Sequence, residues 1–172
     1  MKKTIGKMFI ALINIIVLVA IDQITKIFAV ANLKDADAFV LIDNVLEFYY
    51  LENTGAAFSL LEGGRIFFLI ITVLIVGLCC FFYIKLAYSS AEYKFFGMRI
   101  ALVLLISGAI GNFIDRIRHG YVVDFIYFKP INFPVFNVAD IYVSLAAVLL
   151  CVLVIFVYKD ADFKEVFRGS NE

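Results

Sequence analysis

Four stretches that lack any Asp, Glu, Lys, Arg or His residue constrain this chain more than any other feature. They cover residues 8–21, 66–84, 100–114 and 141–158. The hydrophobic fraction of the 172 residues is 64%, whereas soluble domains contain about 45–50%. The 19 Phe and 9 Tyr side chains add bulk that a soluble chain of this length could not bury. We therefore expect a mainly α-helical, integral membrane protein with four transmembrane helices.

The lengths of these stretches decide what else must enter the membrane. A hydrocarbon core of about 30 Å needs about 20 helical residues at about 1.5 Å each. The stretches 66–84 and 141–158 nearly suffice, but the other two reach only about 21–23 Å. The first and third helices must therefore draw polar residues into or near the membrane. Those residues are Asp22, Gln23, Lys26, Asp115 and Arg116.

The segment between the first two stretches has a different character. Residues 40–42 and 45–51 are β-branched and aromatic, and Asp43-Asn44 between them is a turn signal. They predict a small extracytoplasmic β-element at about 34–62, lying on the membrane surface. Residues 53–58, with Gly55 and two Ala, would let the backbone approach a ligand closely. The helices are expected at about 8–31, 66–84, 97–117 and 138–158, within one membrane-embedded domain of residues 1–172.

Four spans place both termini on one side of the membrane, and the charges favour the cytoplasm for that side. Nine of the 15 Lys and Arg residues lie with the termini and six lie opposite, and positively charged loops tend to stay in the cytoplasm. Lys2, Lys3 and Lys7 before an apolar stretch also resemble a secretory signal peptide. Because three further spans already fix the chain in the membrane, we expect the first segment to be a retained helix.

This parity brings polar residues that are far apart in sequence to one layer near the outer leaflet. The first and third helices end there, the fourth begins there, and the loop between the last two helices lies on the same side. Ionisable groups within a membrane are costly when unpaired, so they are functional candidates by default. The residues gathered in this layer are Asp22, Lys26, Asn112, Asp115, Arg116, Asp124, Asn137 and Asp140.

Several of these residues also have a purely structural interpretation. Asp22 and Lys26 are four residues apart and could pair on one helix face. Asp115, or another carboxylate, could neutralise Arg116. The small residues at 107 and 111 form a step that is typical of close helix packing.

Asp124 and Asp140 favour a chemical role. Asn137 could cap the fourth helix with Asp140 as a first-turn anion, which leaves a structural role open. Both carboxylates can nevertheless reach one layer of low dielectric. Two neighbouring carboxylates there cannot easily both ionise, so that one pKa rises and the other stays low. One proton shared between two Asp side chains is the arrangement that activates water in aspartic proteolysis.

Other chemistries find less support in the sequence. Ser59 and Ser107 lie in no motif with a basic partner, and His119 is the only imidazole. The three cysteines lack metal-ligand spacing, which argues against a zinc site. No phosphate-binding loop or basic, aromatic patch for nucleic acid is present. A small transporter or proton relay that uses buried carboxylates stays open, as does a non-catalytic assembly subunit.

Four motifs, read in order, resemble those of the lipoprotein signal peptidases (signal peptidase II), which are aspartic peptidases of bacterial membranes. The motifs are Asp22-Gln23-Ile24-Thr25-Lys26, Asn53-Thr54-Gly55-Ala56-Ala57-Phe58, Gly111-Asn112-Phe113-Ile114-Asp115-Arg116 running on to Gly120-Tyr121-Val122-Val123-Asp124-Phe125, and Phe136-Asn137-Val138-Ala139-Asp140. The resemblance covers about residues 10–158. Ser107 stands where the family usually has Gly, and Ile141 where a small polar residue is common. Both departures concern local packing.

The resemblance implies that Asp124 and Asp140 are the catalytic pair. The residues it implies in substrate binding or support of the site are Asn53, Gly55, Asn112, Arg116, Asn137 and Ala139. Those implied in structural support are Asp22, Lys26, Asp115 and Gly108. The implied substrate is a prolipoprotein that carries diacylglycerol on a cysteine and is cut just before that cysteine, in the bacterial cytoplasmic membrane. Membrane lipid is the other implied partner, and no nucleic acid, metal or organic cofactor is implied.

Overall fold

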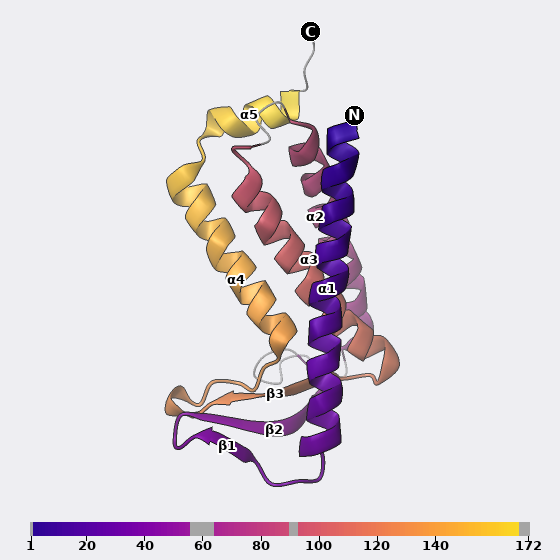
Figure 1. Ribbon diagram of the computed structural model, residues 1–172, viewed down its shortest axis with the longest axis vertical. Helices are drawn as coiled ribbons and strands as arrows, with labels where there is room; N and C mark the ends of the chain where they lie inside the picture. Colours follow the sequence, from indigo (N-terminus) through magenta and orange to yellow (C-terminus); the bar gives the residue numbers. More distant parts are fainter. Residues whose placement is uncertain (1, 56–63, 90–92, 169–172) are drawn as a thin grey trace.

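Four helices that are long and apolar enough to cross a membrane form the body of the protein (Figure 1). The structure is a computed structural model, and it describes residues 2–55, 64–89 and 93–168. The helices are α1 (Lys2–Leu33), α2 (Arg65–Tyr88), α3 (Phe96–Arg118), α4 (Val138–Val152), which continues as the π-helix η3 (Leu153–Val157), and α5 (Asp160–Arg168). The strands are β1 (Phe39–Ile42), β2 (Leu46–Asn53) and β3 (Val122–Phe128), followed by the short 3-10 helix η2 (Lys129–Ile131).

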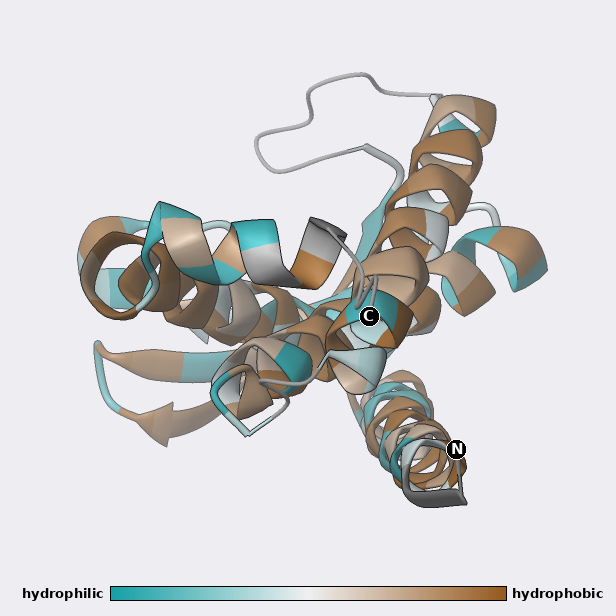
Figure 2. Ribbon diagram, turned by 90° about the horizontal axis from the view of Figure 1, so that it is seen from above, coloured by the Kyte–Doolittle hydropathy of each residue, from teal (hydrophilic) through white to brown (hydrophobic). Residues whose placement is uncertain are grey.

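The expected fold class, a mainly helical membrane protein with four spanning helices and a small sheet, is confirmed. The start of α1 and the helix α5 lie at one end of the bundle, and the sheet lies at the other (Figure 1). Large apolar side chains face outward, among them Phe9, Ile66 and Phe156. Figure 2 shows hydrophobic colour over most of the length of these helices. A helix bundle that exposes apolar surface in this way is suited to lipid rather than to water.

The sheet is antiparallel, with the strand order β1-β2-β3. The predicted turn joins β1 to β2, and its Asn44 has a left-handed φ of 55°, a conformation that Asn tolerates well. The sequence did not predict β3, which pairs with β2 so that Asn53 lies opposite Val122 and Leu51 opposite Asp124. The strand β3 therefore carries Asp124 into the sheet. The part of the expected β-element at residues 56–62 lies outside the described residues, as do Ser59 and the Ala56-Ala57-Phe58 part of the second motif.

Small residues allow α3 to serve as the central helix, packed against α1, α2 and α4. A Cβ atom added at Gly108 would collide with the carbonyl oxygen of Ala139. One added at Gly111 would collide with the carboxylate of Asp22 on α1. Ser107 is fully buried, and its hydroxyl bonds to the Val103 carbonyl of its own helix. The packing interpretation of this step is therefore confirmed.

A hydrophobic core lies at the end of the bundle opposite the sheet. The helix α5, which was not predicted from the sequence, packs against this core. The ring of Phe95, which is fully buried, contacts the rings of Tyr158 and Phe163. Outside this core, Lys94 pairs with Asp162 on α5. These contacts hold α5 across the end of the bundle (Figure 1).

We predict that Gly108→Ala destabilises the protein by about 1–3 kcal/mol, because the added methyl group forces the start of α4 away from α3. The measurement is unfolding of the purified protein in detergent. The matched control is Gly77→Ala, since a Cβ at Gly77 meets nothing within 4 Å. That variant is expected to be neutral or more stable, by up to about 1 kcal/mol. Equal effects of the two substitutions would contradict this account of the packing.

Candidate active site

A buried ammonium group organises the end of the bundle that faces the sheet. Lys26 Nζ lies 3.0 Å from Asp22 Oδ2 and 2.9 Å from Asp115 Oδ2. It also donates to Asn112 Oδ1 at 2.9 Å. Because an ammonium group has three donors, these three contacts saturate it. The expected pairing of Asp22 with Lys26 is thus present, as part of a larger group.

Gln23 completes this group. Its Nε2 lies within hydrogen-bond distance of Asp22 Oδ2, Asp115 Oδ1 and the Gly111 carbonyl, at 3.2, 3.0 and 3.2 Å. We call Asp22, Gln23, Lys26, Asn112 and Asp115 the Lys26 cluster. Asp22, Lys26 and Asp115 are each at most 3% exposed. Charges so deeply buried are tolerated because each finds partners within the cluster.

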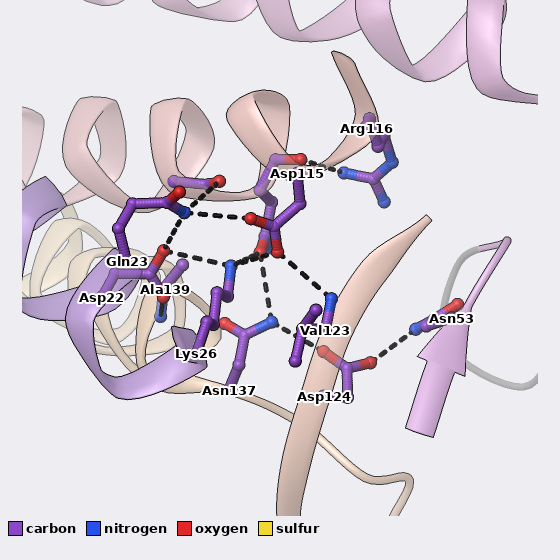
Figure 3. A network of polar contacts seen from close by, with 12 residues as sticks. Asp22, Gln23, Lys26, Asn53, Asp115, Arg116, Val123, Asp124, Asn137 and Ala139 are labelled. Carbon is purple, nitrogen blue, oxygen red and sulfur yellow. Dashed lines mark hydrogen bonds and ion pairs between the residues drawn. The ribbon is translucent and has the colours of Figure 1, made fainter. Parts of the chain in front are cut away.

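The two carboxylates of the Lys26 cluster also accept hydrogen bonds from backbone amides of the residues that precede Asp140 and Asp124. Asp22 Oδ1 accepts a hydrogen bond of 2.9 Å from the amide of Ala139, the residue before Asp140. Asp115 Oδ2 accepts one of 3.1 Å from the amide of Val123, the residue before Asp124. One buried cluster thus fixes the two chain segments that carry Asp124 and Asp140 (Figure 3).

Asp124 is 1% exposed and lies between two asparagine side chains (Figure 3). Asn137 Nδ2 donates to its Oδ1 at 2.6 Å, and Asn53 Nδ2 donates to its Oδ2 at 2.8 Å. Burial raises the pKa of Asp124 to about 7, and the nearby charge of Asp140 adds to the rise, although the two asparagine hydrogen bonds oppose it. Near neutral pH this side chain can therefore hold or release a proton.

Asp140 lies in the first turn of α4 and is tied to the same asparagine. Its Oδ2 accepts from the backbone amide of Asn137 at 3.1 Å, while the Asn137 side chain accepts from the Asp140 amide. Its Oδ1 accepts from Asn112 Nδ2 at 2.8 Å. The capping interpretation of Asn137 and Asp140 is therefore confirmed. It is compatible with a chemical role, because the capping box also fixes the carboxylate beside Asp124.

Both carboxylates line one cavity of about 520 Å³. Its polar side also includes Asn53, Gly55, Asn112 and Arg116. Asn137 and Ala139 are fully buried behind this surface, and Gly108 lies in the α3–α4 contact. The cavity thus gathers six of the residues named from the sequence, and the others support it from behind.

The position of Arg116 differs from one structural interpretation of the sequence. Asp115 pairs with Lys26 and does not neutralise Arg116. Arg116 points to the other side of α3 (Figure 3), where its guanidinium carbon lies 4.8 Å from the centre of the Phe68 ring. Its closest polar partner in the described chain is the Gly55 carbonyl at 3.4 Å, and no described carboxylate lies within 4.0 Å. The cavity therefore has a cation on its rim.

Neither the apolar wall of the cavity nor a role for Gln23 was predicted from the sequence. Among the described residues, the wall consists of Val122, Phe133, Pro134, Val135, Phe136, Ile141, Val143 and Leu145, together with the hydroxyl-bearing Ser144. Residues 133–136 carry no signal beyond hydrophobicity. Gln23 could have been found, because a glutamine beside Asp22 at membrane depth needs buried partners. Among the described residues, no three His, Cys, Asp or Glu side chains are grouped to hold a metal ion.

Comparisons with known proteins place this geometry in a family. A sequence model of the Signal peptidase (SPase) II family matches residues 14–156. The chain belongs to the signal peptidase II family.

Relatives and solved structures agree with this assignment. The lipoprotein signal peptidase of Streptococcus pyogenes serotype M5 (strain Manfredo) is 37% identical over 88% of this chain and 94% of its own length. That of the serotype M3 strain SSI-1 is 36% identical over the same shares.

Two structures of a bacterial membrane enzyme, determined by the in meso method, resemble the fold. The structure at 2.3 Å resolution has a TM-score of 0.73 and 33% identity, covering 94% of this chain and 92% of its own. The structure at 1.9 Å resolution has a TM-score of 0.74 and 35% identity, covering 86% and 94%. As a member of the signal peptidase II family, the chain is an aspartic peptidase of the membrane, and a transporter function is not favoured.

We predict that Lys26→Met destabilises this signal peptidase II family member by about 3–5 kcal/mol, because Asp22 and Asp115 would keep buried charges without a cation. Unfolding in detergent measures the loss. Adding Asp115→Asn to Lys26→Met is expected to recover part of it. The control is Lys34→Met, which removes an exposed pair with Glu52 and should change little. A Lys26→Met variant as stable as the control would overturn the organising role of the cluster.

Proposed function

We propose that Asp124 and Asp140 are the catalytic pair with which this peptidase removes signal peptides from prolipoproteins. One observation carries the proposal. The two carboxylates come from separate elements, β3 and α4, yet they share Asn137 as a hydrogen-bond donor and line the same cavity. A structural cap alone would not require a second buried carboxylate beside the first.

The pair would activate a water molecule bound between its members. The amino end of α4 favours a negative charge at Asp140, so Asp124 is the member that holds the proton. Asp140 takes a proton from the water molecule while the water oxygen attacks the scissile carbonyl carbon. Asp124 gives its proton to the departing amine nitrogen as the C–N bond breaks. The products are a new carboxyl group and a free amine, with the proton now on Asp140.

Donors on the cavity surface would stabilise the oxyanion that forms during this attack. Asn112 and Arg116 both line the cavity, and the guanidinium of Arg116 has no carboxylate partner among the described residues. A preorganised cation in a site that excludes water is worth more than the same cation in bulk solvent. Asn53 and Gly55 lie at the end of β2, where an extended substrate backbone would pass.

The substrate we propose is a prolipoprotein that carries diacylglycerol on a cysteine and is cut just before it. The cavity suits such a substrate because a polar, catalytic side faces an apolar wall formed by residues 133–136 and the start of α4. We place the site near the outer leaflet of the cytoplasmic membrane, with both termini in the cytoplasm. Membrane lipid would surround one single domain, and nothing in the proposal requires nucleic acid or a cofactor.

We predict that Asp124→Asn and Asp140→Asn each reduce cleavage by about 10²–10⁴-fold or more, because either substitution removes a carboxylate from the proton transfers. The assay uses the purified protein with a diacylglyceryl-modified prolipoprotein and with the same protein unmodified. Only the modified form is expected to be cut.

Asparagine has the shape of aspartate and keeps one of the two oxygens that accept hydrogen bonds at each position, so the variants should stay folded. The matched control is Asp43→Asn in the exposed turn between β1 and β2, which should cleave normally. Near-native turnover by a folded Asp124→Asn or Asp140→Asn protein would refute the assignment of the pair. Equal cleavage of the unmodified substrate would refute only the lipid requirement.

The pH dependence follows from Asp124. Since its pKa is about 7 and the protonated form is the active one, kcat/KM should fall as the pH rises above that value. Asn53→Ala removes a hydrogen bond that lowers this pKa, so the alkaline limb should move to higher pH by about 1 unit. In Asn32→Ala, a change on the exposed end of α1, the limb should stay in place. A shift to lower pH in Asn53→Ala would be incompatible with the proposed proton position.

A further inference from the structure

A second cavity lies toward the opposite end of the bundle from Asp124 and Asp140. It has a volume of about 500 Å³ and lies between α1, α2 and α3, at the end that carries the start of α1 and the helix α5. Its walls are mostly apolar, but the cationic side chains of Lys7 and Arg99 also line it. Neither residue takes part in the proposed peptidase chemistry, so this combination needs an explanation of its own.

Arg99 is the residue that points to a ligand. It is only 8% exposed, and its Nε is buried without a hydrogen-bond partner in the described parts of the chain. No carboxylate among those residues lies within 4.0 Å of it, and its one ring contact, with Phe96, is distant at 6.0 Å. A buried guanidinium without an anion is costly. Its place in the first turn of α3 adds to the cost, because the helix dipole disfavours a cation there.

We propose that this cavity binds an anionic phospholipid, with the phosphate at Arg99 and an acyl chain along the wall between α1 and α3. The residues of α1 that line it run from Lys7 to Leu18, about 16 Å at 1.5 Å per residue. Those of α3 run from Phe96 to Leu104. A charged end and a long apolar wall match the two parts of a phospholipid.

Charge selects this occupant over others. The amino-terminal region of a signal peptide is basic, so Arg99 would repel it. A free phosphate ion would leave the apolar wall uncovered. Basic pockets between transmembrane helices on the cytoplasmic side bind anionic lipid headgroups. The cytoplasmic side follows from the proposed orientation, whereas the site itself depends only on the cavity and its charges.

The lipid would contact two helices that also contribute residues to the Lys26 cluster at the other end of the bundle. The helices α1 and α3 line the cavity and also supply Lys26 and Asp115 to the Lys26 cluster. A ligand that binds only the folded protein stabilises it in proportion to its occupancy. An anionic phospholipid should therefore raise the unfolding temperature of the whole bundle.

The test uses the full-length protein in detergent, with phosphatidylglycerol or phosphatidylcholine added. Native mass spectrometry measures lipid retention, and thermal unfolding measures stabilisation. The wild-type protein should retain phosphatidylglycerol more strongly and unfold at a higher temperature with it. Arg99→Gln should weaken retention on the order of tenfold, since a hydrogen bond to a charged group is lost. Arg99→Lys should keep part of the binding.

Two further variants separate the site from general charge and folding effects. Lys85→Gln removes a cation from the last turn of α2, at the same end of the bundle but outside the cavity, and should bind like the wild type. Val103→Phe fills the apolar wall without changing any charge and should also weaken retention. It keeps the test decisive if Arg99→Gln does not fold.

Several outcomes would overturn the proposal. One is equal stabilisation of the protein by the two lipids, and another is phosphatidylglycerol retention by Arg99→Gln equal to that of the wild type. A third is a dimer that dissociates in Arg99→Gln or Val103→Phe, since a second copy of the chain would then fill the cavity. Because no readout involves cleavage, the result is independent of the catalytic assignment. Asp124→Asn should retain the lipid like the wild type.

Discussion

The ammonium group of Lys26 is the interaction on which the rest of the structure depends. It lies within the spanning helix α1 and compensates two carboxylates that come from α1 and α3. With its charge in place, Asp22 and Asp115 are free to use their remaining capacity on backbone amides at Ala139 and Val123. The start of α4 and the strand β3 are therefore held by ionic oxygens, which accept stronger hydrogen bonds than neutral ones.

This arrangement separates support from chemistry within one set of acidic residues. Asp22 and Asp115 are paired with a cation and bonded on the side away from the cavity. Asp124 and Asp140 face the cavity, and their hydrogen-bond donors among the described residues are neutral amides, namely those of Asn53, Asn112 and Asn137. Amide donors orient a carboxylate without the large pKa depression that a direct cation contact would cause. Neighbours of that kind suit the proton exchange that we propose for this pair.

The sequence predicted the fold class and the meeting of polar residues because both follow from simple quantities. The lengths of the uncharged stretches required four spans, and their parity placed the ends of three helices in one layer. The strand β3 was not predicted, because a strand of seven residues gains its identity from pairing with β2, which is far away in sequence. The helix α5 was missed for a related reason, since its docking depends on Phe95 and Tyr158, outside its own residues.

Individual partners were harder to predict than their gathering. From spacing, we expected Asp22 to pair with Lys26 and Asp115 or another carboxylate to neutralise Arg116, whereas Asp115 also pairs with Lys26. The difference is set by the direction of each side chain around α3, which places Arg116 beside Phe68 and Asp115 beside α1. Helix periodicity gives such directions only after the neighbours of the helix are known. The apolar wall of the cavity depends on the same knowledge, since residues 133–136 are ordinary hydrophobic residues until the chain folds them opposite Asp124.

The sheet links the position of the strand β2 to the protonation of Asp124. Asn53 is the last residue of β2, it lies opposite Val122 in the register with β3, and its side chain donates to Asp124. That hydrogen bond favours the charged carboxylate. Any displacement of the end of β2 that breaks it makes Asp124 hold its proton more tightly. The end of β2 is thus coupled, through a single amide and without a change in the helices, to the side chain that we propose as the proton donor.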